Sequence, residues 1–269
     1  MSLAAPLSDR RRRTDRRRGV PHPLAAPLAD AIAADAMEIV FQPQYRCADD
    51  ALVGAEALVR WQGPDESELA GDELFAIAAD AGLEMALSAH VFEAAMRLAH
   101  DWPGELVLSL NVTAANLADA GFADSILALL QRTAFPPARL TLEITEQVLV
   151  SDLERSALVL AELVAKGVRV ALDDFGAGFC NFGYLKMLPL YAIKLDRSMV
   201  DGIARDERDL AVLRGIVSMA DALGLAVIAE GVERAEQRAI VAREGCATWQ
   251  GFLGAKPLAT ADFAVLAAG

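Results

Sequence analysis

Acidic, amide and lysine side chains mark the ends of a series of short apolar segments in this chain. Asp173 and Asp174 are the clearest case, because they close a segment of Val, Ala and Leu that only Arg169 interrupts. If the segments are parallel strands, their carboxyl ends meet at one rim and these side chains converge there. The candidates at or near such ends are Glu56, Asn111, Glu143, Asp173, Asp174, Lys194, Asp196, Glu230, Glu233 and Gln250.

That many gathered carboxylates need cations, since an unpaired buried charge costs several kcal/mol. Ion pairing is one source of positive charge, and the nearby cations are Arg60, Lys186, Lys194 and Arg197. A divalent metal is the other. Carboxylate and amide oxygens without histidine or thiolate form a hard donor set that suits Mg²⁺, Mn²⁺ or Ca²⁺. Any single carboxylate, Asp196 or Glu233 in particular, is also consistent with a structural hydrogen bond to a neighbouring loop.

A glycine-rich segment, Gly176-Ala177-Gly178-Phe179, begins two residues after Asp174. Glycine permits positive φ and lets the backbone approach a ligand closely. A tight turn is the plain alternative for so short a pattern. Its position directly after the acidic pair favours a role at the same site.

The elements that must position these residues alternate between strand and helix. The predicted strands are the apolar, β-branched segments 37–43, 52–60, 105–112, 139–145, 168–174, 191–196, 225–231 and 247–253. Helical spacing occurs in several of the intervening stretches, including 85–100, 146–166, 206–223 and 233–244. Eight strands alternating with helices favour an α/β fold, a modified TIM (β/α)8 barrel, over the alternative of an open doubly wound sheet. Only a short turn separates the first two strands, so we expect them to pair antiparallel.

Composition limits the class of protein. Of the 269 residues, 54% are hydrophobic and 23% charged, which allows a large core and excludes wholesale disorder. No apolar stretch is long enough to span a membrane, the start does not resemble a secretory signal, and Cys47, Cys180 and Cys246 show no paired spacing. We therefore expect a cytoplasmic protein without disulfides or zinc.

Charge divides the chain into two parts. Residues 1–27 hold seven arginines and two aspartates, so the remainder carries a net charge of −18. We predict a flexible basic arm or linker remnant over 1–27 and one folded domain over 28–269. The acidic body repels nucleic-acid backbones, so nucleic acid is not an expected partner.

Eight segments of the chain resemble the motifs of a known family. The segments FQPQ, GAEALVRW, LSLNVT, LTLEITE, ALDDFGAGF, IKLDRSMV, IAEGVE and GCATWQGF are similar in order and spacing to those of the EAL-domain family, whose signature stands here as Glu56-Ala57-Leu58. The resemblance implies a modified TIM barrel with an antiparallel first strand. Because active members of this family are phosphodiesterases, the resemblance also implies an enzyme that hydrolyses cyclic di-GMP to linear 5′-pGpG.

The same resemblance assigns roles to single residues. It places two Mg²⁺ or Mn²⁺ ions among Glu56, Asn111, Glu143, Asp173, Asp174 and Glu230, with Asp173 between them. Such a pair of ions can activate water and stabilise the attacking and leaving oxygens. It implies catalytic roles for Lys194, Glu230, Glu233 and Gln250, and substrate contacts for Gln42, Glu56, Leu58, Arg60 and Asp196. Glu146 matches a glutamate that supports the loop after Asp174.

The resemblance also bears on partners and on alternatives. It implies a homodimer and a place within a larger multidomain signalling protein. The loop departs from the family pattern at Ala177, Cys180 and Asn181, which bears on loop order and turnover rate. A module that binds cyclic di-GMP as a sensor without hydrolysing it is the main alternative, and a metal-dependent barrel enzyme of different chemistry is a third.

Overall fold

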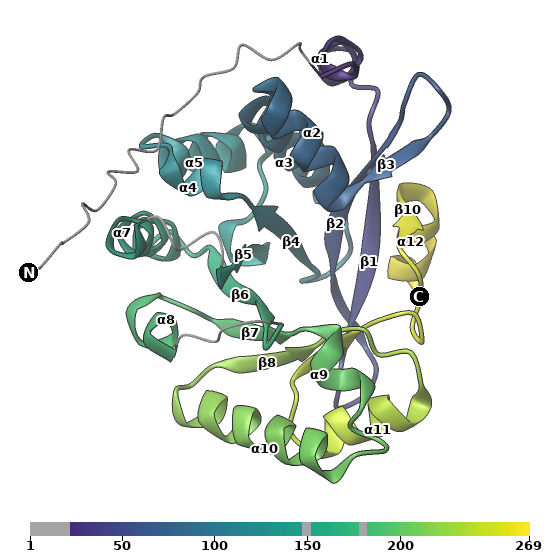
Figure 1. Ribbon diagram of the computed structural model, residues 1–269, viewed down its shortest axis with the longest axis vertical. Helices are drawn as coiled ribbons and strands as arrows, with labels where there is room; N and C mark the ends of the chain where they lie inside the picture. The colour runs from purple at the N-terminus through teal and green to yellow at the C-terminus, as the bar shows by residue number, and fades with distance from the viewer. Residues whose placement is uncertain (1–21, 147–151, 178–181) are drawn as a thin grey trace, which may run out of the picture.

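The computed structural model describes residues 22–146, 152–177 and 182–269, which form an α/β barrel (Figure 1). The strands are β1 (Glu38–Arg46), β2 (Leu52–Gln62), β3 (Glu68–Ala70), β4 (Val107–Val112), β5 (Leu140–Thr145), β6 (Arg169–Phe175), β7 (Ala192–Leu195), β8 (Ala226–Ala229), β9 (Thr248–Gln250) and β10 (Leu258–Ala259). The helices are α1 (Ala25–Ala33), α2 (Gly71–Ala81), α3 (Glu84–Ala99), α4 (Ala114–Ala118), α5 (Phe122–Thr133), α7 (Leu153–Val164), α8 (Phe182–Met187), α9 (Arg197–Asp201), α10 (Glu207–Ala222), α11 (Ala235–Arg243) and α12 (Thr260–Ala268), with a 3-10 turn at Pro137–Arg139.

The sheet closes on itself through β1. The strand order runs β10-β1-β9-β8-β7-β6-β5-β4-β2-β3, and β1 also pairs with β2. β1 is antiparallel to both β2 and β9, whereas the strands from β2 through β4 to β9 are parallel. The barrel with an antiparallel first strand is therefore confirmed, and the open doubly wound alternative is wrong. β3 and β10 extend the sheet outside the closed ring.

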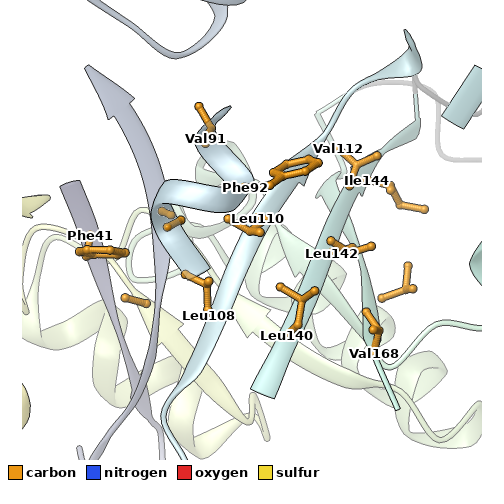
Figure 2. Close-up of a cluster of buried hydrophobic side chains, with 14 of the residues drawn as sticks. Phe41, Val91, Phe92, Leu108, Leu110, Val112, Leu140, Leu142, Ile144 and Val168 are labelled. Atoms are coloured by element: carbon orange, nitrogen blue, oxygen red, sulfur yellow. The ribbon is translucent and has the colours of Figure 1, made fainter. Parts of the chain in front are cut away.

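Side-chain alternation along the strands separates the core from the barrel interior. In β4 and β5 the register joins Leu108 to Leu140 and Leu110 to Leu142, and these leucines pack outward beneath the helices (Figure 2). The residues between them belong to the opposite face, which is the barrel interior. Asn111 and Glu143 are also register partners, so this alternation carries both into the interior at the same height.

Local sequence signals start the surrounding helices. Thr113 and Asn116 form a capping box at α4, directly after β4 ends. Asp152 and Asp206 accept hydrogen bonds from backbone N–H groups in the first turns of α7 and α10. These caps fix the residue at which each of the three helices begins.

The predicted segments and the observed elements agree except at some boundaries. β9 ends at Gln250, three residues before the predicted end, because Gly251 takes φ 154° and the chain turns back toward Val232. The edge strands β3 and β10 carried no alternation long enough to predict. α1 begins at Ala25, inside the predicted arm of 1–27, and residues 1–21 lie outside the described part, so the arm stays a prediction. Among the described residues, no helix has the length and apolar character to cross a bilayer.

Two glycines provide a paired test of barrel closure. A Cβ on Gly54 would lie 2.3 Å from the carbonyl oxygen of Val107 on the neighbouring strand, whereas a Cβ on Gly215, within α10, would meet nothing within 4 Å. Gly54→Ala should therefore destabilise the protein by about 1–3 kcal/mol through overpacking. Gly215→Ala should instead stabilise it by about 0.5–1 kcal/mol, because alanine favours the helix. Urea denaturation measures both, and equal effects would contradict the close β2–β4 contact.

Candidate functional site

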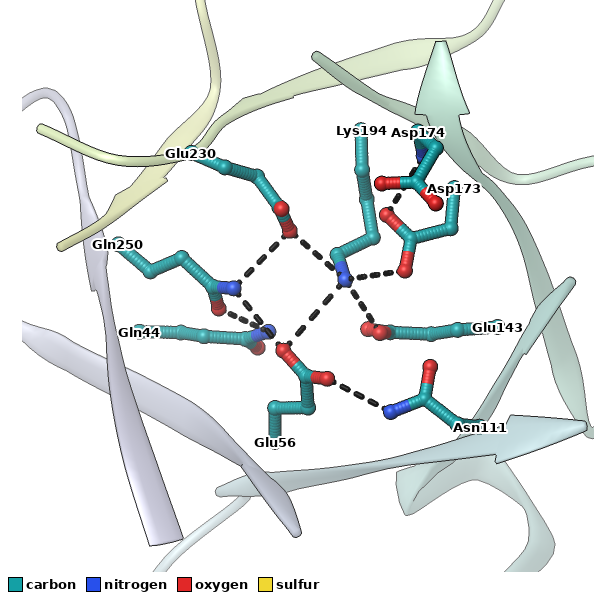
Figure 3. Close-up of polar contacts among 9 residues, drawn as sticks. All are labelled: Gln44, Glu56, Asn111, Glu143, Asp173, Asp174, Lys194, Glu230 and Gln250. Carbon is teal, nitrogen blue, oxygen red and sulfur yellow. Dashed lines mark hydrogen bonds and ion pairs between the residues drawn. The ribbon is translucent and has the colours of Figure 1, made fainter. Parts of the chain in front are cut away.

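Polar side chains from every strand of the closed ring meet at the carboxyl end of the parallel strands (Figure 3). β2 supplies Glu56, β6 supplies Asp173 and Asp174, and β7 supplies Lys194. Glu230 follows the last residue of β8 directly. The complete group is Gln44, Glu56, Asn111, Glu143, Asp173, Asp174, Lys194, Glu230 and Gln250. The structure thus brings together predicted residues from seven strands and adds Gln44 from β1.

Lys194 occupies the centre of the group (Figure 3). Its side chain is 1% exposed, and its Nζ lies 2.7 Å from Glu230, 3.1 Å from Asp173 and 3.5 Å from Glu56. It also donates a short hydrogen bond to Glu143. One ammonium therefore contacts four carboxylates, so ion pairing supplies part of the positive charge that these gathered carboxylates need.

Two amides hold Glu56 in place. The Asn111 side chain donates to Glu56 Oε1 at 2.7 Å, and the Gln250 side chain donates to Glu56 Oε2 at 3.0 Å. Gln250 Nε2 also donates to Glu230 Oε1 at 2.9 Å. Gln250 thus links a carboxylate on β2 to one after β8, across the closure of the barrel.

Burial and crowding shift the pKa values of these carboxyl groups in different directions. Burial raises the pKa of Glu143, and the neighbouring carboxylates Glu56 and Asp173 add to the shift against the opposing effect of Lys194. The pKa of Glu230 rises for the same reasons. Burial acts upward on Glu56 too, but Lys194 and the two amide hydrogen bonds outweigh it and lower its pKa.

The pKa of Lys194 moves the other way. Burial alone would lower the pKa of its ammonium, but the surrounding carboxylates raise it well above the ordinary value. Lys194 therefore stays charged. If all four of its carboxylate neighbours were ionised, the cluster would carry a net charge of −3.

The residues of the cluster fit a hard divalent cation. Glu143 Oε1 is buried and has no hydrogen-bond partner among the residues that the structure describes, so a lone pair inside the site is available. The remaining donors are carboxylate and amide oxygens, which suit Mg²⁺ or Mn²⁺ better than zinc. Within the described ranges, no three His, Cys, Asp or Glu side chains are grouped closely enough to hold an ion as they stand. The carboxylates contact Lys194 Nζ instead.

A cavity of about 230 Å³ opens beside the cluster. Gln42, Glu230, Glu233 and Gln250 are among its lining residues, together with Arg197. Glu233 pairs with Arg197 at 3.1 Å, and the Gln42 side chain donates to the carbonyl of Ala255. Glu233 and Gln42 therefore lie at the rim of the site, outside the network around Lys194.

A larger cavity of about 460 Å³ lies elsewhere. Its lining residues include Ala226, Val227 and Ala247, at the amino-terminal ends of β8 and β9. Two of its charged lining residues, Arg214 and Glu244, are paired with each other at 2.7 Å. Volume alone would point to this cavity, but none of the clustered polar side chains lines it, so we assign the chemistry to the smaller one.

Three further predicted residues have mainly local contacts. Arg60 donates to the carbonyl of Val59, lies 3.9 Å from Glu68, and makes no contact with the cluster in the described residues. Asp196 caps α9 through Ser198, as expected for a structural carboxylate. Leu58 lies on β2 between Glu56 and Arg60 and is partly buried. Their substrate contacts stay predictions.

The loop after β6 is described only in part. Asp174 has φ 55°, and its backbone N–H donates to the side chain of Asp173 at 2.8 Å. Ala177 donates to the carbonyl of Asp174, whereas Cys180 and Asn181 lie outside the described residues. Glu146 immediately precedes the segment 147–151, which is also outside them. Its predicted support of this loop stays a prediction.

Gln44 is the residue of the cluster that sequence reasoning missed. It is 4% exposed and donates through Nε2 to Gln250 Oε1 at 3.0 Å. Two signals could have found it. It stands two residues after Gln42, so the two share a strand face, and it is a polar residue at the end of the buried segment 39–44 of β1.

The fold and this lysine-centred acidic cluster define an α/β-barrel protein whose polar site lies at the carboxyl end of the parallel strands. A family model for the EAL domain matches residues 25–257. The chain therefore belongs to the EAL domain family.

Individual relatives agree with this assignment. The bifunctional diguanylate cyclase/cyclic di-GMP phosphodiesterase MucR of Pseudomonas aeruginosa is 32% identical over 235 residues, which cover 86% of this chain and 34% of MucR. The cyclic di-GMP phosphodiesterase NbdA of the same organism is 33% identical over 238 residues, covering 86% of this chain and 30% of NbdA. This chain thus spans about a third of the length of these relatives.

A solved structure of the PaMucR phosphodiesterase in complex with c-di-GMP superposes with a TM-score of 0.83. It is 31% identical in sequence, and the match covers 89% of this chain and 99% of that one. The similarity therefore extends over most of this chain.

Proposed function

We propose that this protein is a metal-dependent phosphodiesterase that hydrolyses cyclic di-GMP to linear 5′-pGpG, lowering the level of a bacterial second messenger. The observation that carries the proposal is the convergence of Glu56, Asn111, Glu143, Asp173 and Glu230 around Lys194 in a chain of the EAL domain family. In the reaction one water adds across one of the two phosphodiester linkages. The bond from phosphorus to the 3′ oxygen breaks, and the phosphate stays on the 5′ oxygen.

Two Mg²⁺ or Mn²⁺ ions are the proposed cofactors. Glu56, Asn111, Glu143, Asp173, Asp174 and Glu230 would hold them. Bound ions lower the pKa of water and offset negative charge on a phosphoryl group. The unpartnered oxygen of Glu143 and the uncompensated negative charge of the cluster support this cofactor.

The chain's own residues then have distinct tasks. Lys194 keeps a positive charge inside the site and can attract a phosphate oxygen or orient a water. Gln250 fixes the separation of Glu56 and Glu230 through its two donated hydrogen bonds. We propose a catalytic role for Glu233 at the rim of the site. We propose that the substrate contacts Gln42, Leu58, Arg60 and Asp196. A guanidinium such as that of Arg60 can bind two phosphate oxygens at once.

A sensor that binds cyclic di-GMP without turnover is the second candidate. Family resemblance implies that such modules usually lack several of the metal-binding residues, and this chain has all of them. Incubating the purified protein with cyclic di-GMP and Mg²⁺ or Mn²⁺, and following 5′-pGpG by chromatography, separates the two. Steady formation of 5′-pGpG supports the enzyme. Stoichiometric binding without product, with either metal, establishes the sensor instead.

Divalent ions should stabilise the folded protein. The cluster is more negative than one ammonium can offset, so the folded state should bind a divalent cation. A ligand that binds only the folded state raises the free energy of unfolding, by about 2.7 kcal/mol at a hundredfold excess over its Kd. Differential scanning fluorimetry with EDTA and with increasing Mg²⁺ or Mn²⁺ should show a rising Tm. Matched additions of K⁺ provide the control for ionic strength. An unchanged Tm at millimolar metal would count against the two-ion site.

We further propose that the domain acts in the cytoplasm, as a homodimer and within a longer signalling protein. The share of each relative that this chain covers supports the multidomain setting. Exposed Phe182 and Met187 on α8, beside the loop that follows β6, support a protein contact there. The loop substitutions at Ala177, Cys180 and Asn181 leave the candidate metal-binding residues unchanged, so we expect them to affect rate more than the nature of the reaction.

A further inference from the structure

Gln44 lies at a place on β1 where the strand is irregular. The antiparallel pairing of β1 with β2 shifts register between Gln44 and Tyr45, and such irregularities commonly re-aim a side chain. On its other side β1 pairs with β9, where Gln44 stands opposite Gln250. The next pair along, Tyr45 and Trp249, stacks its rings with centroids 4.9 Å apart and holds the two strands in this register.

The direction of the Gln250 amide follows from its partners. Gln250 faces Glu56 Oε2 at 3.0 Å and Glu230 Oε1 at 2.9 Å. Asn111 donates to Oε1 of Glu56, which leaves Oε2 as an acceptor, so the NH₂ end of the Gln250 amide points toward Glu56. Its carbonyl end then points toward β1, where Gln44 Nε2 donates to it at 3.0 Å. Reversing the amide would place its carbonyl oxygen against the Glu56 carboxylate.

We propose that Gln44 is a positioning residue that acts through Gln250. Gln44 donates a hydrogen bond to the carbonyl end of the Gln250 amide, so both ends of that amide have hydrogen-bond partners in the observed direction. Both Gln250 hydrogen bonds to carboxylates are thereby kept, and with them the spacing of Glu56 and Glu230. The consequence for turnover rests on the proposed phosphodiesterase activity, whereas the direction of the amide does not.

A double-variant cycle tests the proposal. Gln44→Met keeps the length of the side chain but removes the donor. We expect kcat for cyclic di-GMP to fall about 10–100-fold, the usual effect of losing a residue that orients a metal-binding group. KM should stay nearly unchanged, because Gln44 does not line the cavity beside the cluster. In a Gln250→Met background, Gln44→Met should cause no further loss. Exposed Gln131 on α5 supplies the control, and Gln131→Met should leave kcat unchanged.

A second readout separates this inference from the proposed function. The side-chain NH₂ of Gln250, assigned by its loss in Gln250→Met, should show NMR resonances shifted by hydrogen bonds to carboxylates. Gln44→Met should move these resonances toward values for a solvated amide even if the wild-type protein lacks turnover. Absence of wild-type turnover would reject the phosphodiesterase alone. Unchanged Gln250 resonances, an unchanged kcat in an active enzyme, or multiplicative losses in the double variant would overturn the role of Gln44.

Discussion

Replacing Lys194 with methionine should strongly destabilise the metal-free protein. The substitution keeps most of the apolar stem but removes the ammonium that contacts Glu56, Glu143, Asp173 and Glu230. Breaking a buried charge pair by removing one partner costs about 3–5 kcal/mol. For a chain of this size that corresponds to a fall in Tm of roughly 6–20 °C. Thermal unfolding in EDTA measures the loss.

Lys166→Met is a matched control for this experiment. Lys166 is exposed between α7 and β6, so its replacement should change stability by less than about 0.5 kcal/mol. Mn²⁺ should restore more stability to Lys194→Met than it adds to the wild type, because the ion supplies positive charge that the variant lacks. Equal Tm values for Lys194→Met and the wild type in EDTA would show that Lys194 is not the counter-ion of the cluster.

Glu56→Gln should abolish most phosphodiesterase activity although it is nearly isosteric. Glu56 accepts hydrogen bonds on both carboxylate oxygens, one from Asn111 and one from Gln250. A glutamine at position 56 presents an NH₂ group to one of these donors, and it also removes a negative charge that a divalent ion needs. We expect turnover to fall on the order of 10²–10³-fold or more, the effect of losing one electrostatic partner in an active site.

Glu38→Gln is the control for this variant. Glu38 is an exposed residue at the start of β1, and its replacement should leave both turnover and stability unchanged. Binding of cyclic di-GMP, measured by calorimetry, should persist in Glu56→Gln if the substitution affects chemistry more than recognition. Full turnover by Glu56→Gln would remove position 56 from the proposed metal site.

The barrel strands and the acidic rim were predictable from the sequence for a shared physical reason. Buried parallel strands need continuous apolar segments, so a polar residue such as Glu143 or Lys194 inside one stands out. The antiparallel first strand followed from a connection too short for a crossover. The edge strands β3 and β10 were missed because two or three residues carry no usable periodicity.

Side-chain direction was the part that sequence could not provide. Lys194 could have faced solvent at the rim, and only the assembled barrel places its Nζ among four carboxylates. The Gln44–Gln250 contact depends on the register of β1 against β9, which a pattern of residues does not specify. Asp196 illustrates the opposite outcome, since its strand-end position resembles that of its neighbours but its carboxylate caps a helix turn.

The central ammonium also bears on how far folding depends on an external cation. In small zinc-binding domains the ligands repel until an external ion arrives, so folding waits for the metal. Here the compensating cation is part of the polypeptide, attached to β7 and synthesised with it. The barrel can therefore reach its native topology in a cell that is temporarily short of divalent ions. The supply of the proposed divalent ions would then govern the activity of the folded protein and not its folding.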